Sequence, residues 1–240
     1  PSPLGDRMRT LAIGDIHGCL TALKTLLDFV APATDDRIVM LGDYVDRGPD
    51  SRGVLDYLIA LHAGGRLVAL RGNHDEMMAE ARINPKGDHS LWLACGGRET
   101  LQSYGVEAAE TCDLTAAPES HWTFLDRDCL DWYETETHFF VHANAYPDLP
   151  LDDQPRYMLL WEKLYEPCRH VSGKVMVCGH TRQVSGQPRN WGATVCIDTG
   201  AYDPQGWLTC LDVATGRYWQ ADQEGRRRAG VLEDPADADY

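Results

Sequence analysis

The 240-residue sequence lacks the features of a membrane protein and of a small disulfide- or zinc-stabilised protein. None of its eight cysteines forms a C-x-x-C pair, and several lie in apolar runs where a free thiol packs as a small hydrophobic group. A structural zinc site is therefore disfavoured, and we expect a reducing cytoplasm without disulfides. No run reaches the roughly 18 apolar residues of a membrane helix. No long apolar stretch precedes Asp6 and Arg7, which predicts that there is no signal peptide.

Basic residues are also scarce, because 22 lysines and arginines are set against 37 aspartates and glutamates, a formal net charge of −15. This balance argues against nucleic acid or an anionic membrane as the main partner. It is equally unfavourable for an enzyme that acts on phosphates. Bound divalent cations and a few arginines can nevertheless reverse the sign of the charge inside one cleft.

The most informative stretch present is Gly42-Asp43-Tyr44-Val45-Asp46-Arg47-Gly48. It follows the apolar run 38–41, which is predicted as a buried strand. The flanking glycines allow the backbone to turn sharply and to approach a ligand closely. Charged side chains at the carboxyl end of a strand stand where open α/β sheets bind ligands. The stretch therefore predicts a binding site, with a solvated turn as the alternative.

The order of predicted elements indicates an α/β protein. Strands over 10–13, 38–41 and 67–70 alternate with helices that begin near residues 20 and 51, which is typical of a largely parallel sheet. We expect one catalytic domain over 1–220, with a helical insertion at about 76–131. Later strands form a second, mixed sheet. The charged tail over 221–240 is predicted to be poorly ordered. The later strands are expected at 139–141, 175–177, 194–197 and 207–211.

Five more segments share the layout of the central stretch, in which small residues mixed with His, Asp or Asn follow an apolar run. Any one of them could be an ordinary turn. Carboxylate, imidazole and amide oxygen together suit manganese, iron or zinc. The whole set therefore predicts a metal site. The segments are Gly14-Asp15-Ile16-His17-Gly18, Gly72-Asn73-His74-Asp75, His142-Ala143-Asn144, Gly179-His180-Thr181 and Asp198-Thr199-Gly200.

The order of these segments resembles the metallophosphoesterase superfamily over residues 9–212. It is most similar to the bacterial and phage serine/threonine phosphatases of the phosphoprotein phosphatase family. The stretches 73–78, 142–147 and 160–161 resemble the phage-type branch. The resemblance implies the calcineurin-like fold, an α/β/β/α arrangement in which two mixed β-sheets pack as a sandwich flanked by helices. It also implies a phosphatase that uses two divalent metal ions, with manganese favoured over iron or zinc, and acts on a phosphoprotein or a small phosphate ester.

The resemblance also implies a role for each matching residue. A water that bridges the two ions would attack phosphorus, His74 would protonate the leaving group, and Asp46 would orient His74. Three basic side chains, Arg47, Arg71 and Lys163, would grip the phosphoryl oxygens. Asp43 would bridge the ions. The metal ligands are Asp15 and His17 for one ion, Asn73, His142 and His180 for the other, and Asp43 for both.

Two departures keep the substrate open. Lys163 stands where the phage-type family usually has an arginine, and a lysine lacks the planar guanidinium fork. Asp75 replaces the glutamate that usual protein phosphatases carry. One alternative is therefore a dinucleoside polyphosphate hydrolase, although those enzymes resemble Gly-Asp-Leu-Val-Ala-Arg-Gly at the central stretch and so lack Asp46. The other alternative is a binding scaffold without catalysis, which is disfavoured because all six ligands and His74 are present.

Overall fold

The computed structural model describes residues 8–106 and 112–235. Two mixed β-sheets form the centre of the molecule. The first has the strand order β11-β10-β9-β1-β2-β3, and the second has the order β4-β5-β6-β8-β7. The first sheet contains β1 (Thr10–Ile13), β2 (Arg37–Met40), β3 (Leu67–Ala69), β9 (Leu208–Asp212), β10 (Arg217–Ala221) and β11 (Arg227–Val231). The second contains β4 (Trp132–Glu134), β5 (His138–Val141), β6 (Val175–Cys178), β7 (Arg189–Asn190) and β8 (Thr194–Cys196).

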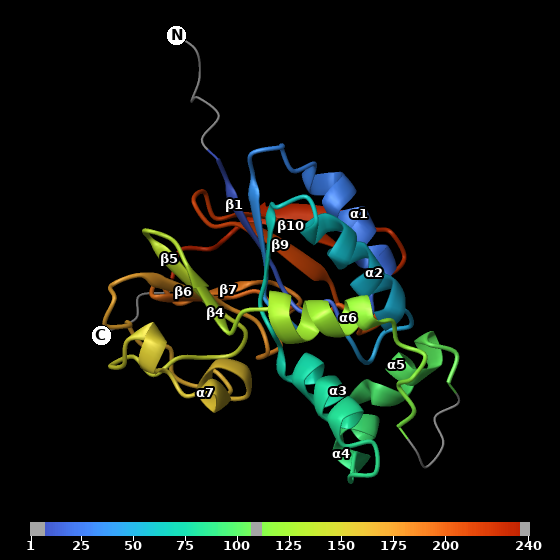
Figure 1. Ribbon diagram of the computed structural model, residues 1–240. Helices are drawn as coiled ribbons and strands as arrows, with labels where there is room; N and C mark the ends of the chain where they lie inside the picture. The colour runs from blue at the N-terminus through green and yellow to red at the C-terminus, as the bar shows by residue number, and fades with distance from the viewer. Residues whose placement is uncertain (1–7, 107–111, 236–240) are drawn as a thin grey trace.

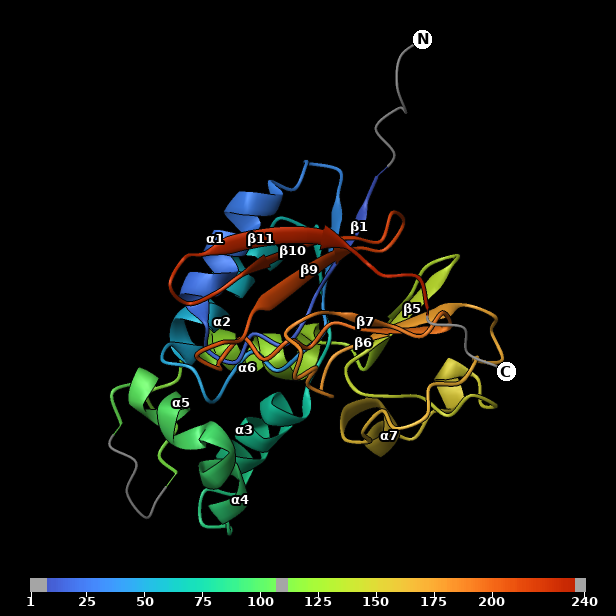
Figure 2. The ribbon, with the colours of Figure 1, turned by 180° about the vertical axis from the view of Figure 1, so that it is seen from behind.

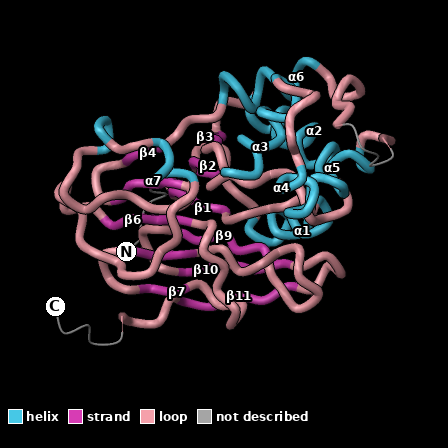
Figure 3. The backbone as a smooth tube through the Cα atoms, turned by 90° about the horizontal axis from the view of Figure 1, so that it is seen from below, coloured by secondary structure: helices cyan, strands magenta, loops and turns pink. Residues whose placement is uncertain are grey.

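The two sheets pack face to face with helices outside, which confirms the predicted sandwich. In Figures 1 and 2, α1 (Leu20–Val30) and α2 (Ser51–His62) cover the outer face of the first sheet. The short helix α7 (Arg156–Leu160) lies beyond the second sheet, and Figure 3 shows most of the other helices gathered at one side of the strands. These include α3 (Asn73–Ile83), α4 (Ser90–Trp92), α5 (Arg98–Ser103) and α6 (Glu119–Thr123), and the π-helical turns η1 (Leu93–Gly97) and η2 (Phe124–Asp128). The 3₁₀ turn η3 (Leu151–Asp153) directly precedes α7 in the chain.

The alternation of side chains along each strand explains the layers. Successive residues of a strand point to opposite faces of a sheet. In β1, Leu11 and Ile13 pack with the helices, whereas Ala12 packs between the two sheets. In β5, Phe140 faces the space between the sheets and Phe139 packs in the outer cluster with α7. The central strands of both sheets are therefore buried on both faces, which is why they read as continuous apolar runs.

The two early helices begin and end where the sequence indicates. Asp50 caps α2, because its carboxylate accepts a hydrogen bond from the Gly53 backbone N–H at 2.8 Å. Helix α1 ends at Val30, where Ala31 adopts a left-handed conformation with φ 46° just before Pro32. Between β3 and β4, helices and π-helical turns account for the described regular elements.

The tail is the part of the fold that differs from the prediction. The expectation of poor order over 221–240 is wrong for residues 227–231, which form β11 and pair antiparallel with β10. Arg228 explains the difference, because its guanidinium lies over the Trp207 ring at 4.2 Å and its Nε donates to the Gln220 side chain at 2.6 Å. The planar guanidinium of Arg228 thereby packs against the sheet, although the sequence around it is charged. Residues 236–240 lie outside the described residues.

All eight cysteines lie among the described residues, and each is a free thiol. Within residues 8–106 and 112–235, every helix is too short or too polar to cross a membrane.

Candidate metal centre and active site

The predicted site residues lie at the carboxyl ends of parallel strands. Strands β1, β2 and β3 run parallel, and so do β5, β6 and β8. Parallel strands present their carboxyl ends at the same edge of a sheet, where ligands of α/β proteins bind. One cavity of about 430 Å³ opens at this edge. It is lined by Asp15, His17, Asp43, Asn73, His74, Asp198 and His180, and also by Arg47.

The backbone at this edge is strained. Six described residues other than glycine have φ in the left-handed region, where a Cβ is unfavourable. Five of the six are predicted site residues, and such outliers cluster at functional sites when the surrounding structure fixes them. Their φ angles are 46° at His17, 52° at Asp43, 73° at Asp46, 68° at Arg47 and 58° at His180.

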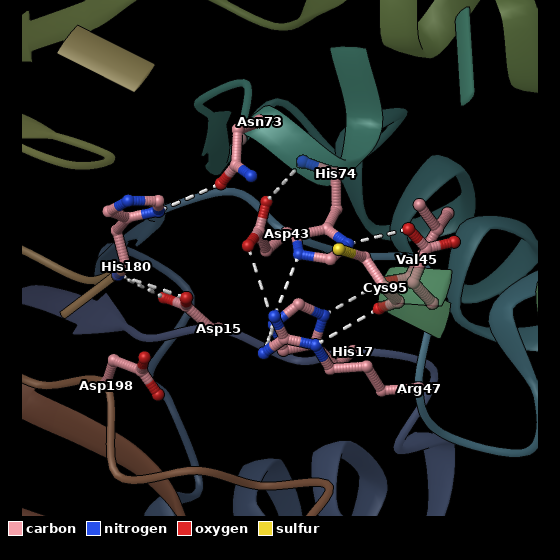
Figure 4. A network of polar contacts seen from close by, with 12 residues as sticks. Asp15, His17, Asp43, Val45, Arg47, Asn73, His74, Cys95, His180 and Asp198 are labelled. Atoms are coloured by element: carbon pink, nitrogen blue, oxygen red, sulfur yellow. Dashed lines mark hydrogen bonds and ion pairs between the residues drawn. The ribbon is translucent and has the colours of Figure 1, made fainter. Parts of the chain in front are cut away.

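One half of the site gathers two histidines around Asn73. Figure 4 shows the His180 ring pointing at the Asn73 side chain. His180 Nδ1 lies 2.9 Å from Asn73 Oδ1, and His142 Nε2 lies 3.0 Å from the same oxygen. The other ring nitrogen of each histidine donates to a backbone carbonyl, that of Trp161 for His180 and that of Leu41 for His142. A neutral imidazole with one N–H fixed in this way presents its free nitrogen to a metal ion.

Burial keeps these histidines neutral. It lowers the pKa of His180 to about 4, and it lowers the pKa of His142 from its ordinary value despite the nearby Asp43 carboxylate. Asp43, His142 and His180 each place a ligand atom within 4.8 Å of the other two. The donors are therefore two neutral imidazole nitrogens, a carboxylate and an amide oxygen, the set that borderline first-row metals prefer.

The other half of the site is built on His17. Its Nδ1 donates to the Val45 carbonyl at 2.9 Å, and its Nε2 lies 3.5 Å from Asp43 Oδ2. Asp43 thus belongs to both groups of metal-ligating side chains, because His17, Asp43 and His74 form the second group within 4.8 Å. The Arg47 guanidinium lies across this half, donating to His17 Nε2 at 3.1 Å and to His74 Nε2 at 3.0 Å.

Asp15 lies in the cavity wall but in neither group. Its carboxylate accepts a hydrogen bond from the His180 backbone N–H at 3.1 Å, which joins the ends of β1 and β6. Burial raises the pKa of Asp15 well above its ordinary value, and the Asp198 and Asp43 carboxylates raise it further. Three buried carboxylates facing one cavity require positive charge nearby.

Asp75 supports the site rather than lining it. Its side chain accepts hydrogen bonds from the backbone N–H groups of Asp43, Tyr44 and Gly72, each at 2.9 Å. The carboxylate at the start of α3 thereby holds the central stretch in its left-handed turn and caps the helix. Burial raises the pKa of Asp75 to about 7, with Asp43 adding to the shift. The shorter aspartate at this departure from the phosphatase pattern thus has a structural role.

His74 and Asp46 form a buried pair beside the metal-ligating groups. His74 Nδ1 lies 2.7 Å from Asp46 Oδ2. Asp46 also accepts from Trp92 Nε1 at 3.0 Å and from Thr100 Oγ1 at 2.7 Å. Burial raises the pKa of Asp46, but three donors stabilise its ionised form, so we take the carboxylate as charged. Burial alone would lower the pKa of His74; Asp43 and Asp46 outweigh it and hold that pKa above its ordinary value.

The three predicted phosphate-gripping residues have different positions. Arg47 and Lys163 line the cavity, whereas Arg71 is absent from its wall. The Nε of Arg71 is buried, and within the described part of the chain it has no hydrogen-bond partner. The structure therefore brings Arg47 and Lys163 to the cavity wall, whereas Arg71 is not among the residues that line it.

Sequence reasoning assigned no role to several residues of this region. Asp198 was part of a recognised segment, and it lies 2% exposed in the cavity wall. Tyr202 lies edge-on to His17, with ring centroids 5.1 Å apart, and beneath the Arg47 guanidinium at 4.5 Å. Arg182 follows the Gly179–Thr181 segment and also lines the cavity. The signal in the sequence is their place within or just after two strand-end segments.

The family assignment agrees with this geometry. The model of the calcineurin-like phosphoesterase family matches residues 8–198, and the chain belongs to that family. The resemblance to serine/threonine phosphatases is confirmed by a relative, the serine/threonine-protein phosphatase 1 of Salmonella typhimurium. It is 32% identical over 167 residues, which cover 67% of this chain and 72% of the relative.

Other relatives carry a different activity. The symmetrical bis(5'-nucleosyl)-tetraphosphatase of Ralstonia nicotianae is 50% identical over 143 residues, or 59% of this chain. The match spans only 44% of that relative's length. Among solved structures, a cold-active protein tyrosine phosphatase of a Shewanella species shares the fold, with a TM-score of 0.59 and 17% identity over 93% of this chain and 80% of that one. A protein serine/threonine phosphatase from Saccharomyces cerevisiae gives a TM-score of 0.56 at 15% identity, covering 97% of this chain and 82% of that one.

Proposed function

We propose that this protein is a metal-dependent phosphomonoesterase that hydrolyses phosphoserine and phosphothreonine esters of proteins. The observation that supports this choice is the buried His74–Asp46 pair beside the metal-ligating groups. A serine alkoxide is a poor leaving group and needs a proton from a positioned acid. The phosphate that leaves a polyphosphate chain is already a stable anion and needs that proton far less. A side chain devoted to charging and orienting His74 therefore favours an alkyl phosphate ester as substrate.

The donor set fits two divalent metal ions. Asp43, Asn73, His142 and His180 would hold one, Asp15, His17 and Asp43 would hold the other, and Asp43 would be shared. Each histidine already donates one ring N–H to a backbone carbonyl and offers the other nitrogen to the cavity. When bound, such ions lower the pKa of water and neutralise the charge of the phosphoryl group. Manganese is our first choice, with iron and zinc as alternatives.

Arg47 would couple metal binding to substrate binding. His17 Nε2 accepts a hydrogen bond from Arg47, and it cannot accept that bond and bind a metal ion at the same time. A metal ion held by His17 would therefore release Arg47 Nη1, and a proton on His74 Nε2 would release Arg47 Nη2, since a protonated ring nitrogen cannot accept a hydrogen bond. The released Arg47 has both fork nitrogens available for phosphoryl oxygens. His74 Nε2 is then free to carry the proton that the leaving group takes.

The other side chains of the site would position the reacting groups. Trp92 and Thr100, from the helical region, hold the Asp46 carboxylate, and Asp46 holds His74 Nδ1. Lys163 contributes positive charge at the cavity wall.

A second candidate is a dinucleoside polyphosphate hydrolase of the same family. The observation that favours it is the 50% identity to a symmetrical tetraphosphatase, higher than the 32% identity to the protein phosphatase. Both activities would use the same metal ligands, so the family and the metal site alone do not separate them. The difference lies in the leaving group and in what surrounds the scissile phosphate.

Chelation tests the metal dependence of the proposed activity. We expect purified protein to release inorganic phosphate from a phosphoserine peptide, to lose this activity in a chelator, and to regain it when manganese is added. The physical reason is that the ions activate the water and neutralise the phosphoryl group. Phosphate release that persists after the metal content has been reduced to zero would overturn the proposal.

A further inference from the structure

The cavity wall carries one cation that the proposed chemistry leaves unused. Arg182 follows His180 and Thr181 directly, and its side chain lines the same cavity as the metal-ligating groups. The side chain is 39% exposed, so it reaches solvent at the cavity mouth. In a protein of net charge −15, a guanidinium at the mouth of a cavity with three buried carboxylates is a specific feature that attracts anions.

Arg182 is held in place, but its partner is replaceable. Its Nη2 pairs with Asp203 Oδ2 at 2.6 Å, and Asp203 is 26% exposed. The guanidinium carbon of Arg182 lies 5.9 Å from the centroid of the Tyr202 ring, and the guanidinium carbon of Arg47 lies 4.5 Å from the same centroid. Gly200 leaves the space for it, because a Cβ there would come within 2.8 Å of Arg182 Nε. A partly exposed ion pair is weak and can exchange one carboxylate for another anion.

The backbone around Arg182 is fixed against the site. The Thr181 hydroxyl accepts from the Leu164 backbone N–H at 2.9 Å, and the ring of His180 donates to the Trp161 carbonyl. The segment carrying Lys163 is therefore joined to the segment carrying Arg182. Two cations, one on each segment, therefore line the cavity, while Arg47 is bound to His17 and His74.

We propose that Arg182 is a specificity-determining residue that binds a second anionic group of the substrate, next to the scissile phosphate. This inference rests on the proposed function and names a preference within it. The second group offers anionic oxygens that the planar guanidinium of Arg182 can bind through two hydrogen bonds. Its source is either a carboxylate flanking a phosphoserine or a further phosphate of a polyphosphate. Asp203 occupies the fork until the substrate replaces it.

Steady-state kinetics on matched substrates tests this role. The substrates are a phosphoserine peptide flanked by glutamates, the same peptide with glutamines, diadenosine tetraphosphate, and para-nitrophenyl phosphate as the substrate with a single anionic group. With Arg182→Gln, we expect KM for the glutamate peptide to rise about tenfold with kcat nearly unchanged, the effect of losing one charge-assisted hydrogen bond at a partly exposed site. The KM for para-nitrophenyl phosphate should stay within about twofold.

Asp203→Asn supplies the opposite change. It removes the carboxylate that competes for Arg182, so KM for the glutamate peptide should fall, whereas a merely structural ion pair would make both variants worse. Arg189→Gln, at an arginine on β7 that lies over Trp191 and outside the cavity wall, is the matched control and should change neither KM. In Arg182→Gln, a rise in KM for diadenosine tetraphosphate alone would show that the second anionic group is a phosphate. A rise in KM for the glutamate peptide alone would show that it is a carboxylate.

The result that overturns the inference is an equal change for all four substrates, or no change, in Arg182→Gln. This failure is distinct from failure of the proposed function. In the first case the wild-type protein still hydrolyses the phosphoserine peptide in a manganese-dependent manner. In the second case it does not, whatever residue stands at position 182.

Discussion

Replacing His74 by asparagine is expected to slow hydrolysis of a phosphoserine peptide by about 10²–10⁴-fold, the usual contribution of a general acid. Hydrolysis of para-nitrophenyl phosphate should slow far less, because para-nitrophenolate is stable near neutral pH without a proton. His74 Nδ1 is fixed by Asp46 at 2.7 Å, so its Nε2 is the nitrogen that faces the cavity and can give the proton. The measurement is kcat on both substrates at saturating manganese.

Two variants serve as comparisons for His74→Asn. Asp46→Asn should show the same bias toward loss on the peptide in weaker form, since Asp46 only orients and charges the histidine. His138→Asn replaces a half-buried histidine of β5 outside the cavity wall and should leave both rates unchanged. If His74→Asn slows both substrates by the same factor, then His74 binds the phosphate or packs, and it is not the acid.

Replacing Asp43 by asparagine is expected to reduce metal content from two ions per chain to less than one and to abolish turnover. Asp43 is the one side chain common to both metal-ligating groups, and it is 2% exposed. Burial alone would raise the pKa of this carboxylate; the neighbouring histidines, among them His74 with its raised pKa, hold it below the ordinary value, so Asp43 is ionised and ready to bind cations. Metal ions supply several kcal/mol of transition-state stabilisation, so the rate should fall by about 10³-fold or more.

The control for Asp43→Asn is Asp198→Asn. Asp198 is also a buried carboxylate of the cavity wall, but it belongs to neither metal-ligating group. It should keep both ions, whereas His17→Ala should chiefly remove one. Metal content is measured by mass spectrometry of the dialysed proteins. Two ions per chain in Asp43→Asn would show that the shared ligand has been misassigned.

Much of the fold was accessible from the sequence because each central strand is an apolar run that ends at polar residues. The run 38–41 was predicted as a strand, and β2 covers Arg37–Met40. Strand β11 was missed because Arg227 and Arg228 read as a charged tail. Stacking of Arg228 on Trp207 joins residues that are far apart in the chain, and no local pattern reports it.

The grouping of the candidate site residues could also be predicted, although their roles stay predictions. The cavity residues lie within a few positions of a strand end. Because parallel strands end at the same edge of a sheet, these residues are expected to lie close together. The groups that support Asp46 were not predictable, because Trp92 and Thr100 come from helices whose distance from Asp46 is set by tertiary packing. Arg71 is not among the residues that line the cavity, and its predicted contact with phosphate stays a prediction, since a motif fixes sequence spacing and not side-chain direction.

A phosphomonoesterase that protonates an alkoxide leaving group should prefer a phosphoserine peptide to a dinucleoside polyphosphate. The manganese-loaded protein is given a phosphoserine peptide and diadenosine tetraphosphate in parallel, and kcat/KM is measured for each. We expect kcat/KM for the peptide to exceed that for the tetraphosphate by at least about tenfold, a difference of about 1.4 kcal/mol in transition-state stabilisation. A kcat/KM for diadenosine tetraphosphate that exceeds that for the peptide by about tenfold would overturn the proposed function and would identify a dinucleoside polyphosphate hydrolase.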